Sequence, residues 1–312
     1  MRIAVLGTGA MGMLFAAMLK KEHDVVLLGR NREKIEALAS QGVTVEEPDG
    51  RMHTAYPTAA EMGTPMEPVD LMIVFVKAMG TREALSKCAN LLGEHTLLLS
   101  LQNGAGHEEE LARFAPMERV LVGTTQHNAS VRGVASVFHG GRGRTVLGSP
   151  AGRLGEAQAA ARALEASGIQ AEASANVRAA IWQKLLTNVS LSALTGVLRV
   201  PMGFVAQSPS AWALCETLIR EACAVAEADG VRFDPKEKAE EVRRVATDGP
   251  MGITSICADL MQGRKTEVDT ISGSVVRAAA RLHVPAPHHE MMVMLIHAME
   301  DQNSQPQSHS NA

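Results

Sequence analysis

Three glycines near the N-terminus have the spacing of a dinucleotide-binding turn. They follow the short apolar run 3–6 and precede a segment, 10–20, with helical periodicity. In that setting the first glycine permits a tight turn, the second lets a pyrophosphate approach the backbone, and the third lets helix and strand pack closely. The N–H groups of the helix N-terminus favour phosphate. The motif therefore predicts a cofactor site made of Gly7, Thr8, Gly9, Ala10, Met11 and Gly12.

The end of the next apolar run, 25–28, bears on which dinucleotide is bound. NAD-binding chains commonly place an acidic residue there to bind the ribose hydroxyls. This chain has Arg30 and Arg32 instead. A guanidinium can hold a 2′-phosphate through two charge-assisted hydrogen bonds, so Arg30 predicts NADPH, with Arg32 assisting. The alternative is a pair of surface arginines at a helix start, where a cation is mildly unfavourable unless an anion is bound.

One lysine lies in an otherwise apolar helical segment of the second half. Lys184 is the only charged residue of 179–192, and it shares one side of the helix with Asn188 and Ser192 because the three follow at spacing four. Helices that are apolar on nearly every face are buried. Burial lowers the pKa of a lysine and suits it to donate a proton near neutral pH. The same residue is equally explained by a buried stem whose ammonium reaches water at a domain edge.

Ser255, Asp259 and Glu267 form a second polar set in apolar surroundings. Ser255 and Asp259 are one helical turn apart, and Glu267 lies near the start of an expected helix, 265–282. Taken alone, Glu267 is explained by the preference of carboxylates for a helix N-terminus.

The segments that carry these residues alternate between strand-like and helix-like patterns in the first half. Apolar runs at 3–6, 25–28, 71–76 and 96–101 are separated by helical patterns at 10–20, 31–39 and 81–92. This alternation predicts a doubly wound parallel sheet of the Rossmann type, covered on both faces. Between residues 120 and 147 the strand-like runs become shorter, and the glycine-rich stretch 140–143 predicts a hairpin turn.

From about residue 174 onward the pattern is helical. Helices are expected at 176–198, 208–228, 235–247, 254–262 and 265–282. The expected fold class is thus α/β, with an NADP-binding domain at 1–173 and an all-α substrate and dimerisation domain at 174–301. The polar stretch 302–312 predicts a disordered tail.

Composition argues against several other classes of function. The chain has 30 basic and 34 acidic residues, a net charge of −4, and only 3% aromatic residues, which disfavours nucleic-acid binding. The sequence has no run of about 18 uncharged apolar residues, so no membrane segment is predicted. The four cysteines are scattered and the histidines lack HExxH spacing, so no metal site is expected. Unpaired cysteines in a chain of this length indicate the cytoplasm.

Taken together, these motifs resemble the ketopantoate reductase family (2-dehydropantoate 2-reductases) over residues 1–299. Besides the glycine motif and Arg30, four short stretches resemble family elements. They are VKA at 76–78 with Lys77, LQNGAG at 101–106 with Asn103, WQKLLTN at 182–188 with Lys184, and TEVDTISG at 266–273 with Glu267.

The resemblance implies an NADPH-dependent reductase of pantothenate biosynthesis that converts a 2-keto acid, ketopantoate, to pantoate. Hydride would reach the C2 carbonyl, and Lys184 would be the general acid. Glu267 would bind the substrate hydroxyl and keep Lys184 charged. The family also implies a homodimer through the helical domain.

Further roles follow from the same resemblance. Ser255 would hold the substrate carboxylate, and Asn188 would help to bind substrate, with Asp259 as a supporting residue. Asn103 and Lys77 would lie where nicotinamide, ribose and substrate meet.

The chain departs from the family pattern at two positions of the lysine helix. Ser192 and Ala193 stand where the family commonly has Asn and Pro, and family members use that Asn in the substrate pocket. Another branched or aromatic 2-keto acid is therefore an alternative substrate. A non-catalytic NADP-binding sensor is a second alternative, although it would need neither Lys184 nor Glu267.

Overall fold

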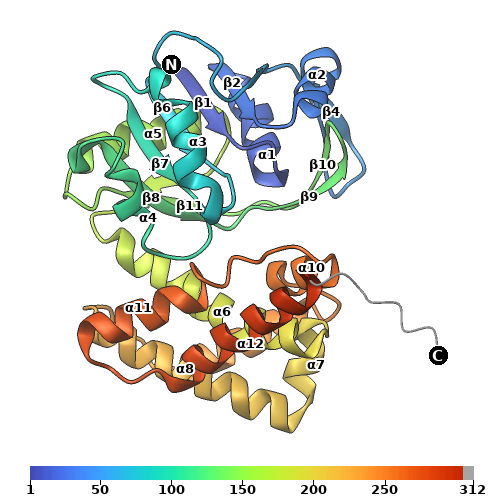
Figure 1. Cartoon of the computed structure of the whole chain (residues 1–312), viewed down its shortest axis with the longest axis vertical. Helices are drawn as coiled ribbons and strands as arrows, with labels where there is room; N and C mark the ends of the chain where they lie inside the picture. Colours follow the sequence, from blue (N-terminus) through green and yellow to red (C-terminus); the bar gives the residue numbers. More distant parts are fainter. Residues whose placement is uncertain (305–312) are drawn as a thin grey trace. The chain divides into compact units, whose positions relative to one another are not determined.

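The computed structural model of the chain describes residues 1–304, which form two compact units. The first unit contains Met1–Gln102 and Gly106–Ala180, and the second contains Asn103–Ala105 together with the residues from Ile181 onward (Figure 1). A short segment of the first half, Asn103–Ala105, therefore belongs to the helical unit.

The first unit is built on a sheet that has eight strands within residues 1–304, in the order β12-β11-β8-β7-β6-β1-β2-β5. The strands are β1 (Arg2–Leu6), β2 (Asp24–Gly29), β5 (Thr58–Glu61), β6 (Leu71–Val74), β7 (Leu97–Ser100), β8 (Val120–Thr125), β11 (Thr145–Gly148) and β12 (Ala171–Ala173). Neighbours from β5 to β8 are parallel, and β11 runs antiparallel to β8. The chain runs from β1 outward to β2 and β5 and then returns to β6 beside β1. The carboxyl ends of β1 and β6 thus form the switch point at which such sheets bind ligands.

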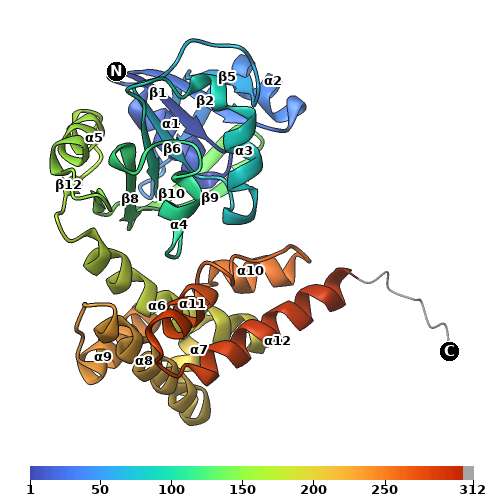
Figure 2. The same ribbon diagram turned by 60° about the vertical axis from the view of Figure 1, so that its left-hand side comes forward.

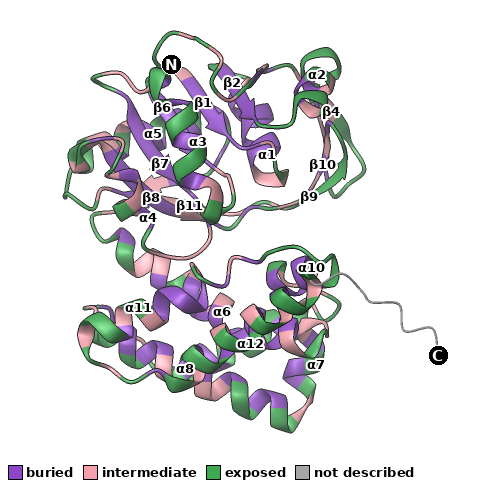
Figure 3. Ribbon diagram, in the orientation of Figure 1, coloured by how far each residue is buried: buried purple, intermediate pink, exposed green. Residues whose placement is uncertain are grey.

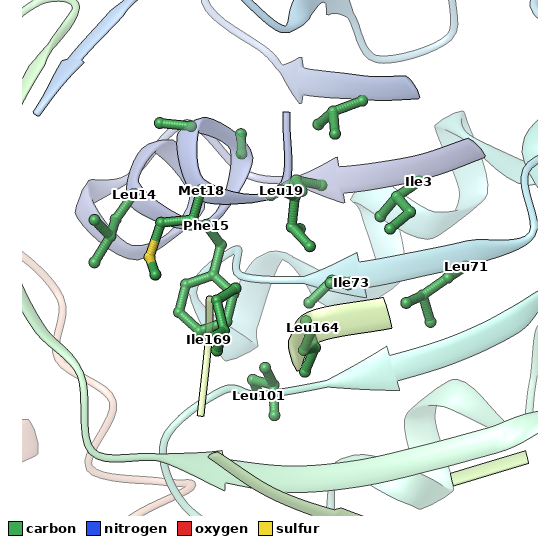
Figure 4. Packing of buried hydrophobic residues seen from close by; sticks show 14 of the residues in the cluster. Ile3, Leu14, Phe15, Met18, Leu19, Leu71, Ile73, Leu101, Leu164 and Ile169 are labelled. Carbon is green, nitrogen blue, oxygen red and sulfur yellow. The ribbon is translucent and has the colours of Figure 1, made fainter. Parts of the chain in front are cut away.

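Helices cover both faces of this sheet. They are α1 (Ala10–Leu19), α2 (Arg32–Gln41), α3 (Thr81–Lys87), α4 (His107–Leu111) and α5 (Leu154–Ala166). Ile3 and Val5 point into a core with α1 and α5, shown in Figure 4, whereas Ala4 and Leu6 point into a core with α3 and α4. All four are fully buried, as are most residues of the central strands (purple in Figure 3). Burying a side chain such as Ile3, Val5 or Leu6 contributes about 1.5–3 kcal/mol. Because both faces of the sheet are covered, apolar residues are favoured at consecutive positions of a strand.

A smaller sheet packs on the α1 side, with the order β4-β3-β10-β9. Its strands are β3 (Val43–Glu46), β4 (Met52–Ala55), β9 (Asn128–Gly133) and β10 (Ser136–Gly141). The predicted hairpin turn at 140–143 is wrong, because β10 pairs with β9 and β3 whereas β11 pairs with β8 and β12. The glycine-rich stretch therefore connects two sheets. Val137 of β10 is fully buried in the α1 core, so the smaller sheet is anchored on this helix.

The described part of the second unit contains helices and no strand (Figure 2). The helices are α6 (Val177–Leu198), α7 (Met202–Gln207), α8 (Pro209–Ala228), α9 (Pro235–Asp248), α10 (Ser255–Met261), α11 (Ser272–Leu282) and α12 (Pro287–Ser304). Ser208 and Asp234 cap α8 and α9 from side-chain oxygens, and each cap is followed by a proline that favours the first helical position. The last helix packs against α8, α10 and α11.

Two expectations for this unit need correction. The expected helix 265–282 begins only at Ser272, because the residues before it form tight turns and the Thr266 N–H and hydroxyl donate to the buried Glu300 carboxylate, at 2.7 and 2.6 Å. The expected disordered tail 302–312 is helical over its first three residues, since α12 extends to Ser304. Residues 305–312 lie outside the described part of the chain.

Candidate active site

The glycine motif forms the turn between β1 and α1. Gly7 has φ +123°, a conformation that side chains rarely adopt, and its N–H donates to the Leu28 carbonyl at 2.9 Å. A Cβ on Gly12 would lie 1.8 Å from the Gly7 carbonyl oxygen, so this position requires glycine. Around Gly9, by contrast, a Cβ would meet nothing within 4 Å. The turn thus leaves open space at its second glycine, where a phosphate would approach the backbone.

A pocket of about 350 Å³ lies at the carboxyl ends of β1, β2 and β6. It is lined by Thr8, Gly9, Gly29, Arg30, Met62, Phe75, Val76, Lys77, Met79, Gly80, Glu83 and Ala84. Four residues predicted to bind cofactor, Thr8, Gly9, Arg30 and Lys77, are among them. The other motif residues, Gly7, Ala10, Met11 and Gly12, shape the turn and the first turn of α1. The pocket has the position and the backbone turn that a dinucleotide needs.

The two arginines after β2 have different surroundings. Arg30 is exposed and lines the pocket, whereas Arg32 forms an ion pair with Glu36 at 2.9 Å. Glu83, from the first turn of α3, also lines the pocket and accepts a hydrogen bond from Lys87 at 2.6 Å. That bond, and more weakly the charge of Arg30, lowers the pKa of the Glu83 carboxyl. Sequence reasoning missed Glu83, because an acid in the first turn of a helix is ordinary.

Gln102 fixes the turn that carries Lys77. Its buried amide donates to the Val76 carbonyl at 2.7 Å and to the Thr81 hydroxyl at 2.8 Å, and its oxygen accepts from the Ser100 hydroxyl at 2.8 Å. These bonds tie the end of β7 to the end of β6 and the start of α3. Gln102 therefore acts on the pocket through the backbone that lines it.

The second unit brings together Lys184, Asn103 and Glu267. The Lys184 ammonium donates to the Asn103 side-chain oxygen at 2.9 Å. Desolvation lowers the pKa of Lys184 to about 8, and the negative charge of Glu267 acts in the opposite direction. Lys184 as a whole residue is half-buried, and the surrounding protein desolvates its ammonium. A lysine in this state is mostly protonated at neutral pH and close to its own titration, as a general acid requires.

The Asn103 segment is held by a backbone anchor that sequence reasoning did not find. The Ala105 N–H donates to the Thr270 carbonyl at 3.1 Å, and Gly104 has φ +99°. A Cβ on Gly104 would lie 1.9 Å from the Thr270 carbonyl oxygen. The Thr270 N–H in turn donates to the Glu267 carbonyl at 3.1 Å. One tight turn thus supports both Glu267 and the loop that presents Asn103 to Lys184.

The remaining predicted substrate residues occupy two helices. Asn188 and Ser192 lie on the same side of α6 as Lys184, and Ser192 is buried. Ser255 is exposed and begins α10, which Thr254 caps. Asp259, in the same helix, is buried and forms an ion pair with Arg264 at 2.8 Å, which stabilises the turn after α10.

A buried series of titratable side chains lies elsewhere in the first unit. The His127 and His139 rings share a hydrogen bond of 2.9 Å, and His139 Nδ1 lies 3.2 Å from a Glu47 carboxylate oxygen. Burial lowers the pKa of His127 to about 4. Within residues 1–304, no three His, Cys, Asp or Glu side chains are grouped to hold a metal ion, and no helix there is long and apolar enough to cross a membrane.

Comparison with known proteins gives consistent matches over nearly the whole chain. Two family models match, Ketopantoate reductase PanE/ApbA over residues 3–152 and its C-terminal model over residues 176–300. The 2-dehydropantoate 2-reductase of Halobacterium salinarum is 33% identical over 293 residues, 92% of this chain and 95% of that relative. The solved structure of D-mandelate dehydrogenase with NADH and anilino(oxo)acetate is 28% identical, with a TM-score of 0.91 over 98% of this chain and 100% of that one. The 2-dehydropantoate 2-reductase of Geobacter metallireducens is 26% identical, with a TM-score of 0.89 over 96% and 99% of the two chains.

Proposed function

This chain belongs to the ketopantoate reductase family, and we propose that it reduces 2-dehydropantoate (ketopantoate) to pantoate with NADPH. It is an oxidoreductase of the 2-dehydropantoate 2-reductase type. The observation that carries the specific reaction is the Lys184 ammonium, with its lowered pKa, bound to Asn103 and under the charge of Glu267. When bound, NADPH supplies the hydride that adds to the C2 carbonyl.

Lys184 is the proton donor of the proposed reaction. Its pKa of about 8 keeps most of the ammonium protonated at neutral pH, and the proton leaves from Nζ as negative charge develops on the carbonyl oxygen. The positive charge stabilises that oxygen before the proton moves. Asn103 accepts a hydrogen bond from the ammonium, so it orients Nζ.

Glu267 has two proposed roles. Its charge raises the pKa of Lys184 against the effect of desolvation, which keeps the acid loaded. Its carboxylate would also accept a hydrogen bond from the substrate hydroxyl. Asn188, Ser192 and Ser255 are proposed to contact the remainder of the substrate, with Ser255 at the carboxylate. Asp259 is assigned a supporting role through its ion pair with Arg264.

The cofactor assignment rests on the pocket of the first unit. Arg30 lines it where a 2′-phosphate would require a cation, and β2 ends without an acidic residue. Lys77 lines the same pocket, and Gly9 leaves room at the N-terminus of α1. These features support NADPH, with Lys77 toward the nicotinamide end.

The substrate is tested by a panel of 2-keto acids with NADPH, followed by absorbance. We expect ketopantoate to have the highest kcat/KM. A kcat/KM for ketopantoate about a hundredfold below that of a competitor, equivalent to roughly 2.7 kcal/mol, would overturn this assignment.

A second candidate is an aryl 2-keto acid, the oxidised partner of a compound such as D-mandelate. The similarity to D-mandelate dehydrogenase over 98% of the chain favours it. Ser192, which is smaller than the family's usual Asn, also leaves space for a bulkier group. In the same panel, this candidate predicts that phenylglyoxylate exceeds ketopantoate, and that Ser192→Asn lowers its kcat/KM selectively.

Two further expectations accompany the proposal. We infer a cytoplasmic enzyme, since Cys88, Cys215, Cys223 and Cys257 are all unpaired and buried. We also infer a homodimer through the helical unit, by family resemblance. Light scattering after size-exclusion chromatography tests the second expectation, because a monomeric mass at micromolar concentration would contradict it.

A further inference from the structure

Two side chains of opposite charge line the nucleotide pocket. Arg30 follows the end of β2, and Glu83 lies in the first turn of α3. The Glu83 carboxylate accepts a hydrogen bond from Lys87 at 2.6 Å, although both side chains are largely exposed. An exposed ion pair of this kind is screened by water and neutralises the carboxylate only in part. The pocket wall therefore keeps an anionic group near the cation that would hold a 2′-phosphate.

We propose that Glu83 is a specificity-determining residue that weakens the preference for NADPH and lets the pocket accept NADH as well. This inference rests on the proposed cofactor site. In NAD-binding chains an acid at the end of the second strand accepts hydrogen bonds from the ribose hydroxyls. Here that strand ends in Gly29, and the acid is supplied from α3 on another wall of the same pocket.

The charges of the two ligands decide the direction of the effect. A 2′-phosphate carries nearly two negative charges at neutral pH, so Glu83 repels it while Arg30 attracts it. The free ribose hydroxyls of NADH have no charge to repel and can donate to a carboxylate. Lys77 is the third charged residue that lines the pocket, and it affects the binding of NADPH and NADH alike. Glu83 thus acts against one cofactor and in favour of the other.

The test is calorimetric titration of NADPH and NADH into wild type, Glu83→Gln and Arg30→Ala at low salt. We expect Glu83→Gln to tighten NADPH binding by about three- to tenfold, and to leave NADH binding unchanged or weaker. The matched control is Glu227→Gln, which breaks a comparable exposed pair with Arg232 outside the pocket lining and should leave both affinities unchanged.

The variants separate this inference from the cofactor assignment on which it rests. Arg30→Ala should weaken NADPH binding at least tenfold and barely affect NADH; equal effects on both would overturn the 2′-phosphate contact. If Arg30→Ala behaves as expected but Glu83→Gln leaves the NADPH to NADH ratio within twofold of wild type, the role of Glu83 is refuted. The same ratio change in Glu227→Gln would also refute it, because the effect would then be one of general charge.

Discussion

Replacing Glu267 by Gln should move the alkaline limit of the reaction to lower pH. Desolvation lowers the pKa of Lys184 to about 8 and the Glu267 charge raises it, so removing that charge leaves desolvation less opposed. In the wild type about nine-tenths of Lys184 is protonated at pH 7, about half at pH 8 and about one-tenth at pH 9. The rate of reduction should therefore fall about tenfold between pH 7 and pH 9.

The size of the shift follows from the lost charge interaction. Loss of an interaction on the order of 1.4 kcal/mol changes the protonation equilibrium about tenfold. The sign is fixed, because Glu267 favours the charged lysine and its removal favours the neutral one. At the acidic end, the kcat/KM of Glu267→Gln should therefore differ from that of the wild type only by a constant factor for substrate binding. At pH 9, the kcat/KM of the variant should be about tenfold lower still relative to the wild type.

The assay is kcat/KM for ketopantoate with saturating NADPH from pH 6 to pH 9.5. Glu267→Asp is the control, since it keeps the charge and should keep the alkaline limit near the wild-type position. A pH profile of Glu267→Gln that is parallel to wild type and merely lower would refute the electrostatic role and leave only substrate binding. A wild-type rate that is constant from pH 7 to pH 9 would refute Lys184 as the acid.

Three further predictions concern backbone and stability. Gly104→Ala should lower kcat by at least about tenfold, because its Cβ would overlap the Thr270 carbonyl. The control is Gly230→Ala, which has φ +87° and open space around it. That variant carries only the conformational cost of roughly 1 kcal/mol and should keep the wild-type kcat. Gly12→Ala should reduce NADPH affinity at least about tenfold by calorimetry, since its Cβ would overlap the first glycine of the motif at 1.8 Å, and an unchanged affinity would contradict the assigned turn. The pKa of His127 is lowered from 6.5 to about 4 in the folded state, so the unfolded chain binds more protons between these two pH values. The free energy of unfolding should therefore fall by about 2 kcal/mol between pH 7 and pH 5. Urea unfolding of wild type beside His127→Gln checks this, and an equal loss in both proteins would contradict it.

Much of the fold follows from local patterns in the sequence. The buried strand 3–6, the glycine turn and the helix of Lys184 are each specified by apolar periodicity and by turn residues that act over a few positions. Strand pairing is not local, however. The sequence of β10 does not say which strands it pairs with, and its pairing with β3 and β9 and its packing against α1 appear only in the structure.

The site was predicted in part for the same reason. Spacing placed Lys184, Asn188 and Ser192 on one side of a helix, and family resemblance paired Lys184 with Glu267. The hydrogen bond from Lys184 to Asn103 was not predicted, because nothing in the sequence indicates which loop meets this helix. A helix was expected to begin at residue 265 and to contain Glu267, but α11 begins at Ser272. Local helix propensity carries no information on the hydrogen bond from Thr266 to Glu300, which joins distant parts of the chain. Glu83 was missed because a pocket formed by several strand ends has no signature within any one segment.

The most direct test of the account is the rate of NADPH oxidation with ketopantoate, measured for wild type beside Lys184→Ala, with NADPH affinity determined for both. The account predicts turnover by the wild type, a loss of kcat of about a hundredfold or more in the variant, and the same NADPH affinity in each. Retention of kcat within about threefold in the variant would contradict the assignment of Lys184. No wild-type turnover despite tight NADPH binding would contradict ketopantoate as the substrate.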